Sequence, residues 1–166
     1  MPRAKKDFIP NAYEPLLATG FVSVIAAEVL HLTYALPFFP IFLGLWLVQF
    51  GMVKLFDIDA FAAKFVQYDP VAGNSRVYAY LYPFIQIALG AAYLGVYYPQ
   101  WISVALVVIA TVNLIGLYRH YDNNKVFKDV TLSGLLRTPL RGEAIIENTL
   151  MTVMALAYLL THKFIW

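Results

Sequence analysis

The stretch WISVALVVIATVNLIGL, residues 101–117, runs for 17 residues without a charged side chain. At about 1.5 Å of rise per residue it forms a helix about 26 Å long, close to the roughly 30 Å thickness of the hydrocarbon core of a bilayer. This length and composition predict a membrane-spanning helix. The remaining sequence is therefore interpreted with the lipid bilayer as its main solvent.

Apolar stretches of similar length lie on both sides of this one. The predicted spans cover residues 16–36, 38–56, 77–97, 101–118 and 144–161. Only 13% of the residues are charged and the mean hydropathy is +0.66, whereas about 25% of the residues of a soluble domain are charged. We predict an all-α, polytopic membrane helical bundle of about five transmembrane helices. It forms a single domain over residues 15–166, after a basic cytoplasmic segment of residues 1–14.

The Lys and Arg residues are distributed unevenly along the chain. Eleven of the 12 precede the first span, lie between the fourth and fifth, or lie between the second and third when Lys54, at the end of the second span, is counted there; Lys163 is the exception. Because basic connections are retained in the cytoplasm, this pattern predicts a cytoplasmic N-terminus and an outside C-terminus. The expected location is a bacterial or archaeal cytoplasmic (inner) membrane. The net charge of +2 gives no reason to expect nucleic-acid binding.

The sequence contains no cysteine. This excludes disulfides, thiolate metal sites, iron–sulfur clusters and thiol–disulfide exchange for the chain acting alone. The first apolar stretch is long enough to span the bilayer, so we expect no cleavable signal peptide.

Residues 57–68 are too short to span a membrane and have a different pattern. Their apolar side chains follow the i, i+3, i+4, i+7, i+8 spacing of one helix face, at Ile58, Phe61, Ala62, Phe65 and Val66. This predicts an amphipathic helix on the cytoplasmic membrane surface. Asp57 or Asp59 could cap its start, and residues 69–74 are expected to end it. A second short surface helix is predicted over residues 126–136.

Glu28 and His31 form the sharpest local feature of the spans. Their i, i+3 spacing puts both side chains on one face of the first span, and an ionisable group in a span requires a partner or a wet cavity. They could ligate a haem or another cofactor, because two ligands on one helix can serve one site. The simpler interpretation is a hydrogen-bonded pair that fixes the first span to its neighbours. No metal site is predicted, since no second copy of the pair exists.

Glu147 lies in the first turns of the predicted last span. The simpler interpretation is that it compensates the helix dipole and caps the helix. Alternatively, it could pair with Lys54 or Arg119 at the cytoplasmic mouth of a cavity. Gln49 and Gln86 are single polar residues in spans, where we expect interhelical hydrogen bonds. The tyrosines around the third span predict an interfacial aromatic belt, and the alternative is a surface on which a quinone or pigment stacks.

One stretch resembles a known family. The run KLFDIDAFAAKFVQYD, residues 54–69, is followed by YAYLYPF at residues 78–84 and by Leu89-Gly90. These residues, and to a smaller degree the last span, resemble the MauE/DoxX family of redox-associated membrane proteins. The resemblance covers roughly residues 40–160.

The sequence departs from that family in two features. Relatives often carry a glutaredoxin-like domain before the first span and a Cys-x-Cys motif before the last, and neither occurs here. An acidic residue that the family tends to place after Pro-Phe is Gln86 in this chain. The resemblance therefore implies the scaffold of the family without its thiols.

We expect a non-catalytic accessory or structural subunit of a larger inner-membrane redox or energy-converting complex, with other membrane subunits as partners. The residues predicted to fasten the surface helix and the cytoplasmic ends of the spans are Lys54, Asp57, Tyr68, Asp69, Pro83 and Glu147. The alternative is a membrane protein that binds a small molecule or cofactor, such as a quinone, haem or pigment, at Glu28 and His31. No nucleophile–base pair or phosphate loop indicates an enzyme.

Overall fold

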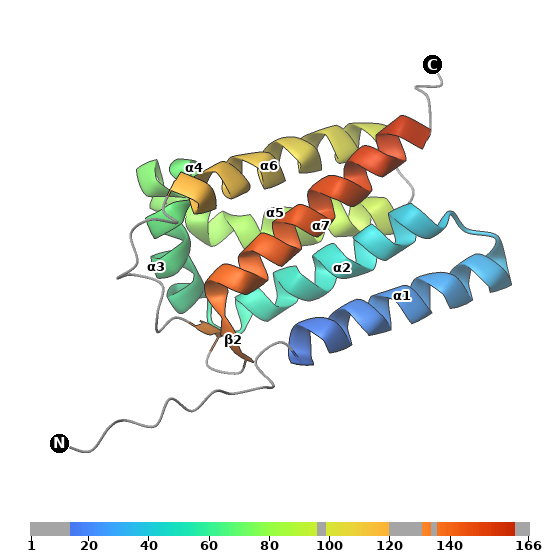
Figure 1. Ribbon diagram of the computed structural model, residues 1–166, viewed down its shortest axis with the longest axis horizontal. Coiled ribbons are helices and arrows are strands. Elements are labelled where there is room, and N and C mark those ends of the chain that lie inside the picture. The colour runs from blue at the N-terminus through green and yellow to red at the C-terminus, as the bar shows by residue number, and fades with distance from the viewer. Residues whose placement is uncertain (1–13, 96–98, 120–130, 134–135, 162–166) are drawn as a thin grey trace.

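The computed structural model describes residues 14–95, 99–119, 131–133 and 136–161 of the chain, which form seven helices and two short strands (Figure 1). In chain order these elements are α1 (Glu14–Tyr34), α2 (Phe38–Leu55), α3 (Ile58–Tyr68), α4 (Pro70–Asn74), α5 (Arg76–Leu94), α6 (Pro99–Arg119), β1 (Thr131–Ser133), β2 (Leu136–Pro139) and α7 (Leu140–Thr161).

The prediction of a five-span helical bundle is confirmed. Five helices, α1, α2, α5, α6 and α7, are long and apolar enough to cross a membrane. The predicted surface helix is α3, and Asp57 caps its start by accepting a hydrogen bond from the backbone N–H of Ala60 at 3.2 Å. The chain is therefore a multi-pass membrane protein.

One local prediction is wrong. The helix expected over residues 126–136 is replaced, where the structure describes it, by β1 and β2, which pair as an antiparallel hairpin; residues 126–130 and 134–135 lie outside the described residues. Residues 69–74 end α3 as expected but also build the short helix α4. Asp69 begins α4 because its Oδ1 accepts hydrogen bonds from the N–H groups of Val71 and Ala72, at 2.9 and 2.6 Å.

The helix α2 forms the centre of the bundle. It packs most extensively against α5, while α6 packs against α7 (Figure 1). Gly44 and Gly90 make the close approach of α2 and α5 possible, because a Cβ atom built on either glycine would lie 2.8 Å from the carbonyl oxygen of the other. Small residues at such crossings let membrane helices pack through their backbones.

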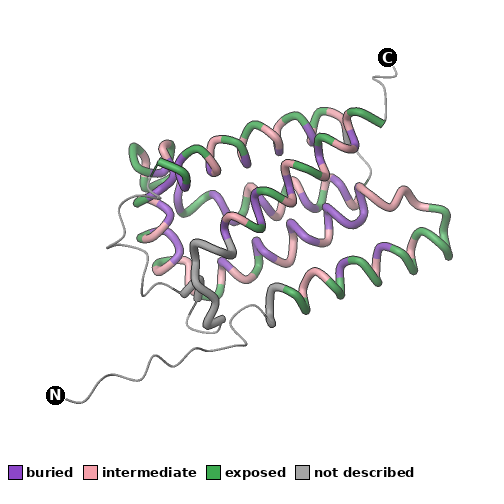
Figure 2. Tube along the Cα trace, viewed as in Figure 1, coloured by how far each residue is buried: buried purple, intermediate pink, exposed green. Residues whose placement is uncertain are grey.

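The first span is far less covered than the others. Within the described residues, 11% of its apolar window is buried, compared with 56% of the window of α2. Figure 2 shows exposed positions along most of α1, whereas buried positions concentrate on the other helices of the bundle. Gln49 of α2 donates a hydrogen bond to Ser23 of α1 at 3.1 Å, which confirms the interhelical bond predicted for this glutamine.

The helices α3 and α4 cover one end of the bundle. Phe61, Phe65 and Tyr68 of α3 are buried in a cluster with Tyr82 of α5 and Leu117 of α6. The amphipathic pattern of α3 thus turns its apolar face toward the spans. This end of the molecule also contains the charged residues of the bundle interior.

Candidate functional site

A charged cluster lies inside the bundle where three spans meet. Lys54 of α2 donates hydrogen bonds from its Nζ atom to Oε1 of Glu147, at 2.5 Å, and to Oε1 of Gln86, at 2.7 Å. The Nε2 atom of Gln86 donates to the same oxygen of Glu147 at 2.5 Å. Lys54 and Gln86 are each 3% exposed and Glu147 is 2% exposed. The three side chains therefore join α2, α5 and α7 through a closed triangle of bonds.

The position of Glu147 in its helix explains why it can reach Lys54. The sequence placed Glu147 in the first turns of its span, but α7 begins at Leu140, about two turns earlier. The carboxylate therefore points into the bundle, and the preferred interpretation of Glu147 as a capping residue is wrong. The alternative interpretation, in which Glu147 pairs with Lys54, agrees with the structure.

Aromatic rings surround the ammonium group of Lys54. Its Nζ atom lies 5.9 Å from the ring centre of Phe50, 5.7 Å from that of Phe61 and 5.3 Å from that of Tyr82. Each ring presents its negative face to a cation at such distances. Because α3 supplies Phe61, the ion pair also contacts the surface helix.

A second polar network continues from Tyr82. Nδ2 of Asn113, from α6, donates to the Tyr82 hydroxyl oxygen at 2.8 Å and lies 3.2 Å from Oδ1 of Asn148, from α7. Asn148 in turn donates to the carbonyl of Ala144 at 2.8 Å. Through the ring of Tyr82, the two networks link α2, α5, α6 and α7.

The cluster has little space for a ligand. The cavity that touches Gln86 and Tyr82 has a volume of about 10 Å³, which is room for about one water molecule. A buried ion pair whose polar atoms bond one another can hold helices together or pass a proton.

Asp69 caps α4 beside this cluster. Burial of the side chain raises the pKa of its carboxyl above the usual value, and the hydrogen bonds from the backbone of Ala72 and Val71 oppose part of that rise. The carboxyl is 1% exposed. Its chemistry is that of a helix cap that orients the turn between α3 and α4.

The other residues predicted for this end of the molecule have contacts of their own. Asp57 caps α3, Tyr68 packs edge-on against Phe65, and Pro83 lies inside the continuous helix α5. Their role in fastening the spans stays a prediction.

Glu28 and His31 lie elsewhere, on the exposed side of α1. Nδ1 of His31 is 2.6 Å from the carbonyl oxygen of Leu36. Because a carbonyl only accepts hydrogen bonds, Nδ1 carries the proton and the lone pair of Nε2 is available in the neutral ring. Within the described residues, no third His, Cys, Asp or Glu joins them as a metal ligand.

Sequence reasoning missed the second network. Asn113 and Tyr82 were not singled out as partners, although an asparagine inside a span is a signal for interhelical bonding. It did expect Gln86 to bond between helices, and this is confirmed. Tyr82 and Tyr93, which were assigned to an interfacial belt, are buried instead; Tyr93 bonds Ser103 of α6 at 2.7 Å.

The five spans and the buried ion pair define a class of protein: a multi-pass α-helical membrane protein with a charged, close-packed interior. Comparison with known families then identifies the family itself. The family described as "Methylamine utilisation protein MauE" matches residues 29–161. The chain belongs to this MauE family. No curated protein and no solved structure matches the chain.

Proposed function

We propose that this protein is a non-catalytic accessory subunit of a larger redox or energy-converting complex of the cytoplasmic membrane. The name of the MauE family supports methylamine utilisation as its setting. Two structural features support the proposal, namely a closed polar core and an uncovered first span.

The polar core supports a role without catalysis. Lys54, Gln86 and Glu147 use their polar atoms on one another, and the cavity beside them holds about one water. Such an arrangement supports a role in holding the spans together. The chain also lacks the cysteines through which the resembled family is expected to transfer electrons.

The observation that carries the proposal is the exposure of Glu28 on α1. Glu28 lies six residues before the end of the span at Tyr34, about 9 Å inside it. An acidic or basic residue at the centre of a membrane helix costs about 2.5–3.5 kcal/mol on insertion scales, and intramembrane charges pair with other groups. An uncovered carboxylate at this depth therefore favours a partner helix that supplies a donor.

His31 strengthens this interpretation because it lies one turn further along the same face. Its ring is fixed by the Leu36 carbonyl, so Nε2 can accept a hydrogen bond from a neighbouring chain. The pair thus presents two acceptors on a helix that also exposes large apolar side chains, including Phe21 and Val24. This combination fits contact with another membrane subunit.

The test is purification of the tagged protein from its native membrane in a mild detergent. We expect stoichiometric membrane subunits to co-purify with the wild type and to be lost from the double variant Glu28→Leu/His31→Leu. The variant Phe21→Leu changes another exposed residue of α1 and should retain the partners. A lone monomer from the wild type would overturn the proposal.

The fixed ring of His31 also favours a second candidate, a bound cofactor. A histidine whose Nδ1 donates to a backbone carbonyl is oriented for ligation through Nε2. An absorbance spectrum and a lipid extract of the same preparation separate the two functions. Haem bands or an extracted quinone or pigment that disappears in the double variant would assign a cofactor, whereas a colourless and quinone-free complex supports the accessory role.

A further inference from the structure

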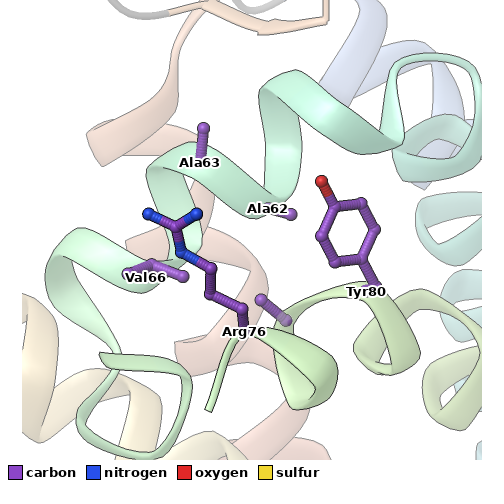
Figure 3. Close-up of a pocket in the computed structure, with 6 residues that line it drawn as sticks. Ala62, Ala63, Val66, Arg76 and Tyr80 are labelled. Atoms are coloured by element: carbon purple, nitrogen blue, oxygen red, sulfur yellow. The ribbon is translucent and has the colours of Figure 1, made fainter. Parts of the chain in front are cut away.

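A cavity of about 190 Å³ lies between α3 and α5, and none of its lining residues belongs to α1 (Figure 3). The residues that line it are Ala62, Ala63 and Val66 of α3 and Arg76, Ala79 and Tyr80 of α5. Three of the six are alanines, whose short side chains leave the space open. Since Arg76 is the first residue of a span, the cavity lies at the boundary between the hydrocarbon core and the headgroup layer.

Arg76 gives the cavity a positive group. Figure 3 shows its side chain reaching from α5 toward Ala63 and Val66 of α3. Within the described part of the chain, no carboxylate lies within 4.0 Å of its nitrogens. Guanidinium binds the oxygens of a phosphate through parallel hydrogen bonds, and the first turn of a helix such as α5 also favours an anion.

A negative group lies at the edge of the same cavity. Tyr80 lines the cavity, and its hydroxyl donates a hydrogen bond to Oδ1 of Asp59 at 2.8 Å. Asp59 is exposed and therefore accessible to a ligand. A guanidinium and a carboxylate beside one small cavity fit a zwitterion that combines a phosphate with an ammonium group.

An exposed apolar face of α5 next to the cavity indicates that this zwitterion is part of a lipid. Val77, Tyr80, Leu81 and Phe84 are 68%, 41%, 50% and 52% exposed. Their i, i+3, i+4, i+7 spacing forms one continuous face of α5, and Tyr80 belongs both to this face and to the cavity. An acyl chain can lie along the face while the headgroup occupies the cavity, whereas a free phosphate would leave the face unused.

The geometry points to a phosphatidylethanolamine site between α3 and α5. Arg76 binds the phosphate, Asp59 accepts hydrogen bonds from the ammonium group, and the exposed face of α5 holds an acyl chain. Phosphatidylglycerol offers no cation to Asp59. The quaternary ammonium of phosphatidylcholine has no N–H to donate and is bulkier. The site therefore selects ethanolamine among these headgroups.

Native mass spectrometry of the purified protein tests this site. The protein is incubated in detergent with phosphatidylethanolamine, phosphatidylglycerol or phosphatidylcholine of identical acyl chains, and retained lipids are counted. We expect the wild type to retain phosphatidylethanolamine best. Arg76→Gln should weaken its retention about tenfold or more, because it removes charge-assisted hydrogen bonds. Asp59→Asn should remove the preference for ethanolamine and leave phosphatidylglycerol binding intact.

Two variants keep this test decisive. Arg119→Gln removes an exposed basic residue at the end of α6, which does not line the cavity, and should leave retention unchanged. Arg76→Lys keeps the charge but loses the planar fork, so it should bind at an intermediate level even if Arg76→Gln fails to fold.

Three results would overturn the proposal. The first is equal retention by the wild type and a folded Arg76→Gln. The second is an equal loss in Arg119→Gln, which would indicate a general charge effect. In a separate arm, soluble phosphoethanolamine replaces the lipids; its Arg76-dependent binding without retention of any lipid would assign the cavity to a free ligand instead.

Discussion

At the scale of single residues, the ion pair between Lys54 and Glu147 is the most consequential contact of the bundle. Both side chains are almost fully buried, so loss of one partner leaves an uncompensated charge in a medium of low polarity. Breaking such a pair costs about 3–5 kcal/mol, whereas replacing both partners by apolar residues is often neutral or stabilising. The pair therefore matters more for what its disruption costs than for its net contribution.

We predict that Lys54→Met and Glu147→Leu each lower the free energy of unfolding by about 3–5 kcal/mol. The double variant should lose clearly less than the sum of the two, because it removes both charges together. Gln86 then remains without its partners, so recovery will be incomplete. Denaturant unfolding in detergent, analysed as a double-mutant cycle, measures the coupling.

The control for this cycle is Arg119→Met, which removes an exposed charge and should change stability by less than about 0.5 kcal/mol. Additive losses from Lys54→Met and Glu147→Leu would show that the two charges are not coupled. Losses as small as that of the control would contradict the burial of the pair.

The pairing of Lys54 with Glu147 could not be predicted from the sequence alone. Lys54 and Glu147 were recognised as polar residues near span ends, but 93 positions separate them. No local pattern selects one partner over another at such a separation. The choice depended on the true start of α7, because the helix begins four residues before the predicted span, and about one extra turn moves Glu147 away from the helix end into the interior. Helix starts are among the least certain features of a sequence pattern.

At the scale of secondary-structure elements, the close packing of α6 against the junction of α3 and α4 depends on Gly116. A Cβ atom at this position would collide with the carbonyl oxygen of Tyr68 and lie 2.8 Å from Cδ of Pro70. Both obstacles are backbone or ring atoms that cannot rotate away. The junction, with its Asp69 cap, therefore fixes the position of the surface helices against the spans.

We predict that Gly116→Ala destabilises the protein by about 1–3 kcal/mol, the usual cost of overpacking a tight interior. Gly73→Ala in α4 is the matched control, since its Cβ would meet only the carbonyl oxygen of Val66, at an ordinary 3.4 Å. This control should keep or slightly raise stability, as alanine favours helix more than glycine does. Thermal unfolding in detergent compares the two variants, and equal melting temperatures would argue against the tight contact.

The elements differed in how well they could be predicted. The five spans and α3 follow from hydrophobic periodicity, because length and spacing alone distinguish a membrane span from an amphipathic surface helix. The hairpin of β1 and β2 was missed because its pairing joins Thr131 to Pro139 and Ser133 to Leu136. Such pairing outweighs weak local helix propensity. Gly134 between the strands was the available signal for a turn.

At the scale of the whole molecule, the structure combines a bundle interior joined by polar bonds with two exposed features, namely the helix α1 and the cavity between α3 and α5. The interior of α2, α5, α6 and α7 is joined by buried polar bonds, while α1 attaches mainly along α2. The exposed carboxylate of α1 and the cavity between α3 and α5 lie on different parts of the bundle surface. A partner subunit on α1 and a lipid at α3 can therefore bind at the same time.

The charge distribution makes a prediction about how this molecule lies in the membrane. Eleven of the 12 basic residues fall in the N-terminal segment, in the two connections predicted to be cytoplasmic, or in the ends of the spans that border these connections. The absence of cysteine means that each introduced cysteine is a unique reporter of its side. We predict that Gly73→Cys in α4 reacts with a membrane-impermeant maleimide only after the cytoplasmic face is opened. Tyr34→Cys, at the C-terminal end of α1 on the predicted outer side, should react in intact cells.

These two reporters decide the orientation because they lie at opposite ends of the spans and are both exposed. The reverse labelling pattern would contradict the predicted topology and would also move the Arg76 cavity to the outer leaflet. Labelling of both positions in intact cells would indicate a mixed orientation. A second cysteine at Lys163, the one basic residue on the predicted outer side, provides an independent check. Lys163→Cys should be labelled under the same conditions as Tyr34→Cys. Four spans separate the two positions, and an even number of spans places them on the same face of the membrane.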